Sequence, residues 1–475
     1  MPATDSPAII VARFLKANHY NDTLDAFLRE AGLPPDAGST ERGDLTIEKI
    51  LAEKKTFDIS LAFEKVGVGN DRGWNAVTAP SRPYRVTTLP TSANLLHVSV
   101  GSFPDGNHED ARQLLLATTA DRRLHVLAVE ETFTLLKSLS HLQGSPILSC
   151  VLFGKINITT ITSGMSGQVI LYDHQEHKVL DERRDHSKYV VKVEVWEDGE
   201  GAWIATAGWD GKVFLYRIGE EIVGGLKLGP PVATITLATN PETVNFVKHP
   251  DHESPVLLVT RRDSTSLHYY SLPSPEEPST STQSVAPVAP AGPTELEHLG
   301  SQNLAPHSSA WIAFSPSSVA ISPIDPALVA VATSAVPHMK LIIVRLLLPQ
   351  VGSSSVAPTA PTTQAGQTRA NLAVQDREDA AIQIHVSTMA PQTPYSTPMV
   401  VWRPDGSGVW VNGDDGVLRG LEAKTGKVVS TLKGGHEVGS KIRSIWCGMV
   451  GREEWVVSGG FDRRLVVWKP DKDTA

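Results

Sequence analysis

Short runs of Val, Ile, Leu and Thr, separated by turn residues, recur in sets of four along residues 84–469. The sets repeat with a period of about 40 residues, which is typical of repeat architectures. Each run has the length of one strand, and a single set is too small to bury its own apolar faces. The repeat therefore predicts a mainly β fold in which four-stranded sheets stack around a ring, that is, a β-propeller.

Seven copies of the repeat can be traced, so we predict seven blades. They contain residues 95–129, 147–172, 190–216, 233–272, 318–346, 399–421 and 442–468. A ring of sheets leaves one seam with exposed strand edges, and proteins cover such edges. We expect the strand-like run at 84–89 to pair with the last blade and close the ring.

The two clearest copies share a polar pattern, with Asp four residues after a Ser or Thr and six before an aromatic residue. In this pattern they resemble WD40 repeats. The resemblance implies a buried hydrogen-bonded tetrad, formed by His436, Ser458, Asp462 and Trp468 in the last copy and by His186, Thr206 and Asp210 in the earlier one, where Tyr216 replaces the preferred Trp. Such a chain satisfies polar groups that burial would otherwise leave unpaired, so we interpret these residues as structural.

The other copies keep only parts of this pattern. In the copy at 147–172, His141 and Thr162 occupy tetrad-like places, but Ser166 stands where Asp is expected. The turn at 413–416 lacks the alternating oxygen ligands of a calcium loop, which favours a plain β-turn.

The first part of the chain has helical instead of strand-like spacing. Ser6 before Pro7 is a helix-start signal, and Ile10 and Phe14 follow on one helix face. A second helix is expected from about 22 to 31 and a third from about 46 to 65, on the spacing of their apolar residues. We therefore predict a small helical module at 1–66, a linker at 67–83 and the propeller at 84–475.

Seven residues of the first two helices, Phe14, Leu15, Tyr20, Thr23, Leu24, Phe27 and Glu30, resemble the LisH motif. One departure is His19, where the family usually has Gly. The resemblance implies a two-helix hairpin that pairs subunits through Phe14, Leu15, Tyr20, Leu24, Phe27 and Leu28. Two helices of this length cannot bury an adequate core alone, which independently favours pairing. The alternative is that they pack on the rest of their own chain.

Two segments, near 273–293 and 349–376, interrupt the repeat and are rich in Pro, Ser, Thr and Ala. Their composition cannot bury enough apolar surface to order them, so flexible insertions are expected. Each follows the third strand of a blade, which would place both on the face opposite the His and Asp loops. They are either loop expansions without a function or tethers for a partner.

Composition limits the partners and the location. The net charge is −9 and no block of Lys and Arg occurs, which argues against nucleic acid as a partner. No apolar stretch is long enough to span a bilayer, and the N-terminus does not resemble a secretory signal. We expect an intracellular protein of cytoplasm or nucleus without membrane insertion, in which Cys150 and Cys447 are buried free thiols.

Catalytic and metal-binding residues are not expected, and neither is a cofactor. His436, Ser458 and Asp462 are the residue types of a hydrolase triad, but the tetrad accounts for them better. His249 and His252 lack a third metal ligand nearby, so a polar loop explains them better. The glycines at 67, 69 and 73 lie in the linker without the strand and helix of a phosphate loop.

The sequence favours a non-catalytic scaffold that binds other proteins and forms a homodimer or higher oligomer through the LisH module. Trp209 and Arg463, in loops on the tetrad side, are candidate partner-binding residues, because aromatic and Arg anchors dominate interface energies; alternatively they pack on a neighbouring blade. A second hypothesis is a substrate receptor or core structural subunit of a complex such as a ubiquitin ligase or corepressor. Residues 216–217 and 468–469 lack the Asp of the Trp-Asp-x-Arg receptor motif, which weakens the receptor version. An enzyme that uses the propeller's central channel is a third hypothesis.

Overall fold

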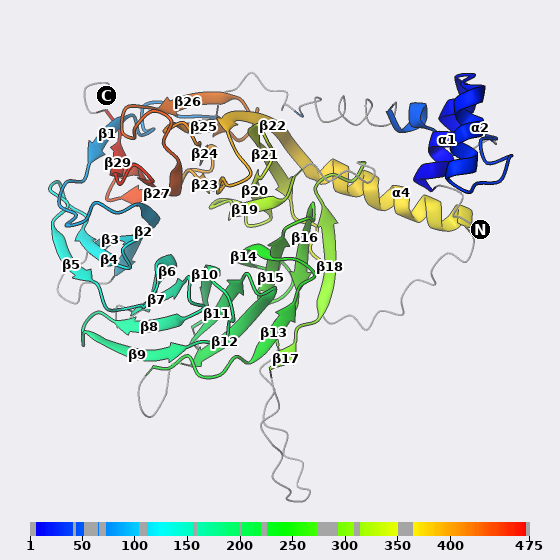
Figure 1. The fold of residues 1–475 in the computed structure, drawn as a ribbon. Helices are drawn as coiled ribbons and strands as arrows, with labels where there is room; N and C mark the ends of the chain where they lie inside the picture. Colours follow the sequence, from blue (N-terminus) through cyan, green and yellow to red (C-terminus); the bar gives the residue numbers. More distant parts are fainter. Residues whose placement is uncertain are drawn as a thin grey trace, which may run out of the picture. The chain divides into compact units, whose positions relative to one another are not determined.

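The computed structural model describes residues 6–40, 44–51, 65, 73–103, 112–154, 159–199, 201–219, 226–273, 293–307, 314–349 and 364–471. The chain divides into two compact units, residues 1–64 and residues 65–475. The first unit is helical and the second is a ring of sheets (Figure 1).

The helical unit begins with α1 (Pro7–Ala17) and α2 (Asn21–Glu30). Ser6 caps α1 as expected, since its hydroxyl accepts from the backbone N–H of Ile9 at 3.4 Å. Between the helices His19 has φ of 60°, a left-handed conformation that Gly adopts without cost. This explains why the LisH family usually has Gly at the position of His19.

A short helical segment at residues 47–51 follows, and Thr46 caps it by accepting from the N–H of Lys49 at 3.2 Å. The buried Arg13 connects α1 to the approach of this segment, with ion-pair and hydrogen-bond distances of 2.8 Å to Asp44 and 3.0 Å to the carbonyl of Leu45. The predicted third helix falls mostly on residues 52–64, which lie outside the described residues. Its predicted end at Lys65 is wrong, because Lys65 forms a β-bridge instead.

The second unit is a seven-bladed β-propeller, as predicted (Figure 1). In blades 1 to 6 four strands pair antiparallel in chain order, and the first of them lies nearest to the centre of the ring. Blade 1 has β2 (Leu95–Phe103), β3 (Arg112–Thr119), β4 (Leu124–Ala128) and β5 (Leu135–Leu139). Blade 2 has β6 (Ile147–Phe153), β7 (Thr159–Gly164), β8 (Val169–Asp173) and β9 (Lys178–Arg183). Blade 3 has β10 (Val190–Glu197), β11 (Gly201–Gly208), β12 (Lys212–Gly219) and β13 (Ala233–Thr236).

The remaining blades follow the same plan. Blade 4 has β14 (Pro241–Val247), β15 (Val256–Arg261), β16 (Ser266–Tyr270) and β18 (His298–Asn303). Blade 5 has β19 (Pro316–Ile321), β20 (Leu328–Thr333), β21 (His338–Arg345) and β22 (Ile382–Pro391). Blade 6 has β23 (Val400–Trp402), β24 (Gly408–Val411), β25 (Leu418–Glu422) and β26 (Val428–Leu432). Blade 7 has β27 (Ile442–Val450), β28 (Glu453–Gly460) and β29 (Leu465–Lys469).

Strand β1 (Arg82–Arg85), from the start of the unit, supplies the fourth strand of blade 7. It pairs antiparallel with β29, and Tyr84 lies opposite Val467. The predicted closure of the ring is therefore confirmed, although the paired residues are 82–85 and not 84–89. The pairing covers the outer edge of β29.

Both insertions lie between the third and fourth strands of a blade, as expected. Residues 274–292 are outside the described part, and the chain returns as β17 (Thr294–Glu295), which pairs parallel with β13 at the edge of blade 3. Residue 233 was predicted to start blade 4, but it starts β13, which is the last strand of blade 3. The prediction of a flexible segment is wrong for residues 364–376, because they belong to α4 (Gln364–Ala381). This stretch contains three Ala and three Gln, which are good helix formers.

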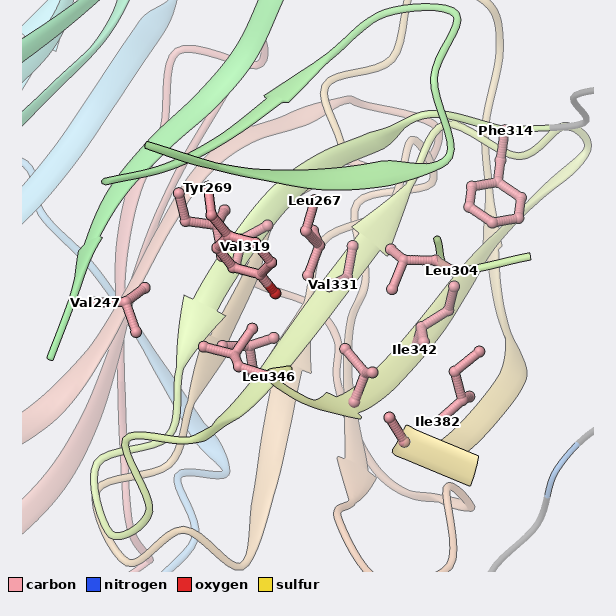
Figure 2. Close-up of a cluster of buried hydrophobic side chains, with 14 of the residues drawn as sticks. Val247, Leu267, Tyr269, Leu304, Phe314, Val319, Val331, Ile342, Leu346 and Ile382 are labelled. Atoms are coloured by element: carbon pink, nitrogen blue, oxygen red, sulfur yellow. The ribbon is translucent and has the colours of Figure 1, made fainter. Parts of the chain in front are cut away.

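The core lies between neighbouring blades. Figure 2 shows one such layer, where Val247 and Tyr269 of blade 4 face Val319 and Ile342 of blade 5. The Tyr269 hydroxyl donates to the Gln302 side chain at 2.7 Å, so its polar end is satisfied inside this layer. Equivalent clusters fill the other interfaces, which explains why nearly every strand carries apolar residues on both faces.

Lys65, at the end of the predicted helical module, and the described part of the predicted linker are both attached to the ring. Lys65 exchanges backbone hydrogen bonds of 3.0 and 3.1 Å with His385 of β22. Trp74 packs edge-on against Trp410 of blade 6, with ring centroids 5.2 Å apart. Ser81 then donates to the carbonyl of Lys469 in blade 7 at 2.9 Å. The approach to β1 therefore contacts blades 5, 6 and 7 in turn.

Arg403 holds this attachment together from a fully buried position after β23. Its guanidinium donates to the buried Glu454 of blade 7 at 2.6 and 3.0 Å. It also donates to the carbonyl of Asn75 at 3.2 Å and to the hydroxyl of Thr78 at 3.3 Å, and it lies 4.3 Å from the Trp74 ring. One cation thus joins blade 6, blade 7 and the approach to β1, with its donors satisfied.

We predict that Arg403→Met lowers the free energy of unfolding by about 3–5 kcal/mol, because it leaves the Glu454 carboxylate buried without its partner. Adding Glu454→Gln should recover part of this loss, as a double-mutant cycle in urea would show. The control is Arg345→Met, which removes an exposed ion pair of 2.9 Å to Asp325 and should cost less than about 1 kcal/mol. Equal losses for the two Arg variants would contradict the role given to Arg403.

Candidate interaction site

The structure brings the four predicted residues of the last blade together. His436 Nδ1 lies 3.0 and 3.1 Å from the two carboxylate oxygens of Asp462, and Nε2 lies 2.8 Å from the Ser458 hydroxyl. That hydroxyl accepts from the indole N–H of Trp468 at 2.9 Å. Because a carboxylate only accepts, Nδ1 of His436 carries a proton. The four side chains form one continuous hydrogen-bonded chain.

Blade 3 repeats the first part of this chain. His186 Nδ1 lies 3.0 Å from the Asp210 carboxylate, and Nε2 lies 2.9 Å from the Thr206 hydroxyl. Tyr216 does not complete the set, because its hydroxyl donates to Asp185 at 3.0 Å instead. Tyr216 therefore joins β12 to the loop before His186.

Blade 2 differs from the sequence-based expectation. The Thr162 hydroxyl accepts at 2.9 Å from the buried amide of Gln143, and the expected His141 is exposed. Gln143 therefore takes the place predicted for His141. The error arose because Gln was not considered for a position that the family gives to His, although an amide N–H can donate to the same hydroxyl.

The Asp side chains of the two tetrads also fix backbone. Asp462 accepts from the N–H groups of Glu437 and Arg464 at 2.9 and 3.3 Å. Burial raises the pKa of Asp462, but the hydrogen bonds from His436 and from these N–H groups outweigh burial and hold the pKa below its ordinary value. A carboxylate held ionised in this way joins the loop before the first strand to the turn after the second.

Glycine is required beside both Asp–His pairs. A Cβ on Gly208 would lie 2.2 Å from the His186 ring, and one on Gly460 would lie 2.6 Å from the Asp462 carboxylate. Side chains at these two positions would separate the imidazole from the carboxylate. The Gly two residues before Asp is thus part of the same structural device.

We call the end of the ring that carries these two Asp–His pairs the tetrad face. Its turns share one backbone hydrogen bond, which we call the clip. The turn residue before the Asp position donates its N–H to the loop residue that precedes the first strand. This bond recurs at 2.9–3.0 Å in Ala120–Asn94, Met165–Pro146, Trp209–Tyr189, Arg262–Asn240, Ser334–Ser315 and Phe461–Lys441. Trp209 and Phe461 are therefore equivalent positions of different blades.

The two candidate partner-binding residues differ in their surroundings. Trp209 is half-buried, because its ring stacks on Tyr189 at 4.6 Å and lies beneath the Arg262 guanidinium of blade 4 at 4.2 Å. Arg463 is exposed, with φ of 63°. Trp209 therefore packs on a neighbouring blade, which was the alternative to partner binding, whereas the Arg463 side chain is exposed.

A β-bulge recurs where the first strand of a blade meets this face. Among the described strands, the register with the second strand skips one residue in six blades: Leu96, Leu148, Val191, Glu242, Ser317 and Arg443. All six are half-buried. A bulge changes the direction of the side chain that it leaves unpaired. We call these six residues the bulge residues. Sequence reasoning missed them, and the only signal was a charged residue within an apolar strand.

Two of the bulge residues, on blades 4 and 7, carry opposite charges. Glu242 of blade 4 and Arg443 of blade 7 attract each other, and each charge shifts the pKa of the other. Burial, together with the charges of Lys192 in blade 3 and Arg443 in blade 7, lowers the pKa of His97 in blade 1 to about 4. These blades are not all neighbours, so their side chains approach one another only near the axis.

In the helical unit the predicted dimerisation residues fall into two groups. Leu24 and Leu28 are buried with Ala12, and Leu15 and Phe27 pack against this cluster. Phe14 and Tyr20 are not part of it; their rings contact each other at 6.5 Å, and Tyr20 is 54% exposed. Of the six residues, Phe14 and Tyr20 therefore lie outside the buried cluster of the described helices.

The remaining candidates are explained by local structure. His249 accepts from the N–H of Asp251 at 3.1 Å and lies 3.1 Å from the carbonyl of Pro349, so both ring nitrogens are engaged. Cys150 is buried and Cys447 half-buried, and both are free thiols whose pKa burial raises. None of the helices in the described part of the chain is long and apolar enough to cross a bilayer.

Two family models match the chain. The model described as UCP007778, beta-propeller domain, matches residues 84–284 and 306–469, which is more than half of the chain. The model described as UCP007778, LisH domain, matches residues 8–35. The predicted LisH and propeller resemblance is therefore confirmed. A search of curated proteins finds no match.

We predict that Asp462→Ala lowers the free energy of unfolding by about 1–3 kcal/mol, since it strands the His436 ring and two backbone N–H groups. Unfolding in urea, followed by tryptophan fluorescence, would measure this loss. Glu131→Ala is the matched control, because Glu131 is an exposed carboxylate of blade 1. If the two variants unfold at the same urea concentration, the tetrad does not stabilise its blade.

Proposed function

Because the chain belongs to the UCP007778 family, which joins a LisH domain to a β-propeller domain, we propose that it is a non-catalytic scaffold. In this proposal the helical unit pairs two chains, and the tetrad face of each propeller binds partner proteins. Nothing beyond the architecture selects one kind of complex, so a ubiquitin ligase or corepressor subunit is a special case of the same proposal.

The observation that carries self-association is an apolar face that lies outside the buried cluster formed by the described residues of the helical unit. Ile10, Val11 and Phe14 of α1 lie on the side away from the cluster around Ala12, and Tyr20 extends this side. Val11 is 36% exposed. A twofold axis would place this face against its own copy, and the pairing would bury side chains that so small a unit leaves in water.

The burial of the tetrad supports a scaffold over an enzyme. His436 and Ser458 are buried, and Ser458 is fully enclosed between the imidazole and the Trp468 indole. A hydrolase nucleophile must reach its substrate. The residue types of a triad are therefore present in a geometry that supports a structural role.

Self-association is tested with Tyr20→Asp. Tyr20 is the N-cap of α2 and makes no side-chain cap hydrogen bond, and Asp is a preferred N-cap residue. The substitution should therefore keep α2 folded while it places a charge in the pairing face. We expect light scattering to give half the wild-type mass, with unchanged helical circular dichroism. Ala26→Asp, on the exposed side of α2, is the control and should stay paired. A wild-type mass for Tyr20→Asp would refute pairing through this face.

Partner binding is tested by affinity purification of the full chain followed by mass spectrometry. We expect a protein recovered in stoichiometric amount with wild type to be lost with Phe461→Asp, because Phe461 is 42% exposed on the tetrad face. Lys427→Asp is the control, since Lys427 is exposed in the turn between β25 and β26, at the other end of the ring. Loss with the control and retention with Phe461→Asp would place the binding surface elsewhere.

A further inference from the structure

The bulge residues divide the centre of the tetrad face into two chemically different parts. Those of blades 1 to 3 are Leu96, Leu148 and Val191, so this side is aliphatic. Those of blades 4, 5 and 7 are Glu242, Ser317 and Arg443, so the opposite side is polar. A ligand that spans the axis would therefore contact aliphatic groups on one side and charged groups on the other.

The two charges on the polar side are not equally satisfied. Glu242 forms an ion pair with Arg262, a turn residue of its own blade. Arg443 makes no hydrogen bond or salt bridge within the described residues, and its nearest influence of opposite sign is the Glu242 charge across the axis. Arg443 is half-buried, and burial lowers its pKa. A partly desolvated guanidinium without a hydrogen-bond acceptor favours an incoming anion.

The turns around Arg443 add positive charge. Arg463 of blade 7 and Arg122 of blade 1 occupy the same turn position, are both exposed and have φ of 63° and 69°. The carboxylates of these two turns are already engaged. Asp462 binds His436, and Asp121 accepts from the hydroxyls of Thr91 and Thr119.

Exposed apolar side chains lie on the same sector. Phe461 of blade 7 is 42% exposed and Met165 of blade 2 is 50% exposed, and both occupy the turn position that the recurrent clip defines. In blade 2 the Asp of the turn is replaced by Ser166. The face over blades 7, 1 and 2 therefore combines Arg side chains with apolar ones, although the whole chain has a net charge of −9.

We propose that this sector binds a peptide segment of a partner protein in which a carboxylate side chain, held by Arg443, stands beside an aliphatic or aromatic one, held by Leu96 and Leu148. The inference rests on the proposed scaffold function and names the chemistry of its partner. Arg463 and Arg122 attract the acidic segment, and Phe461 and Met165 cover its apolar residues. Charge complementarity selects this occupant, since a basic peptide would meet Arg443 while the described turn carboxylates Asp462 and Asp121 are already engaged.

The test is selection of a displayed random-peptide library on the full-length protein. We expect enriched peptides that combine Asp or Glu with Leu, Ile or Phe. A fluorescein-labelled enriched peptide should bind in an anisotropy titration, and its counterpart with Asn or Gln in place of Asp or Glu should bind at least about tenfold more weakly. Enrichment without acidic residues, or no enrichment, would overturn the proposal.

Variants of the protein locate the contact. Arg443→Gln should weaken the peptide by at least about tenfold, and the surface variant Arg463→Gln should weaken it less and reduce its dependence on salt. Lys427→Gln, at the other end of the ring, is the control with the same charge change and should bind like wild type. The thermal midpoint of each variant shows that the ring is folded, and Arg463→Gln keeps the test valid if Arg443→Gln does not fold. Wild-type affinity in both Arg variants would overturn the proposal.

Failure here is distinguishable from failure of the scaffold function. If Arg443→Gln still recovers the partner that Phe461→Asp loses, the tetrad face binds proteins but Arg443 does not hold a carboxylate. If neither variant changes recovery, the scaffold proposal itself has the wrong surface.

Discussion

The pairing of β1 with β29 is the constraint on which the rest of the second unit depends. In a ring of sheets each blade buries its apolar faces only against two neighbours, so an open seam would expose two faces as well as two strand edges. Four residues at the start of the unit, 82–85, close that seam by backbone hydrogen bonds to the last strand. The apolar cluster between blades 7 and 1 depends directly on this closure.

Much of this fold follows from the sequence because the responsible signals are local and repeated. Each copy shows apolar strands and turn glycines, and the Ser–Asp–Trp spacing of the last blade is legible because all three residues lie within one hairpin and its flanks. Gln143 was missed because it supports the same hydroxyl with a different residue type. The helix at 364–376 was missed because its neighbours in the sequence are rich in Pro and Ser, although the stretch itself favours helix.

The candidate site was less predictable, because it is made by residues that no single repeat contains. The bulges are a matter of register between paired strands, and a half-buried Glu242 or Arg443 gives no sign in the sequence of which blade it faces. Trp209 was selected for its type, yet its partners Tyr189 and Arg262 come from another turn and another blade. Only the ring places such residues together around one axis.

The attachment of Lys65 and of residues 73–81 to blades 5, 6 and 7 has a mechanical consequence. Among the described residues, a pull from the helical unit would act first on Lys65, which two backbone hydrogen bonds hold to β22. The pull would then act on the hydrogen bond between Arg403 and Asn75, and only after that on β1, the strand that closes the ring. Tension applied at Lys65 would therefore act on these contacts before it acts on the seam.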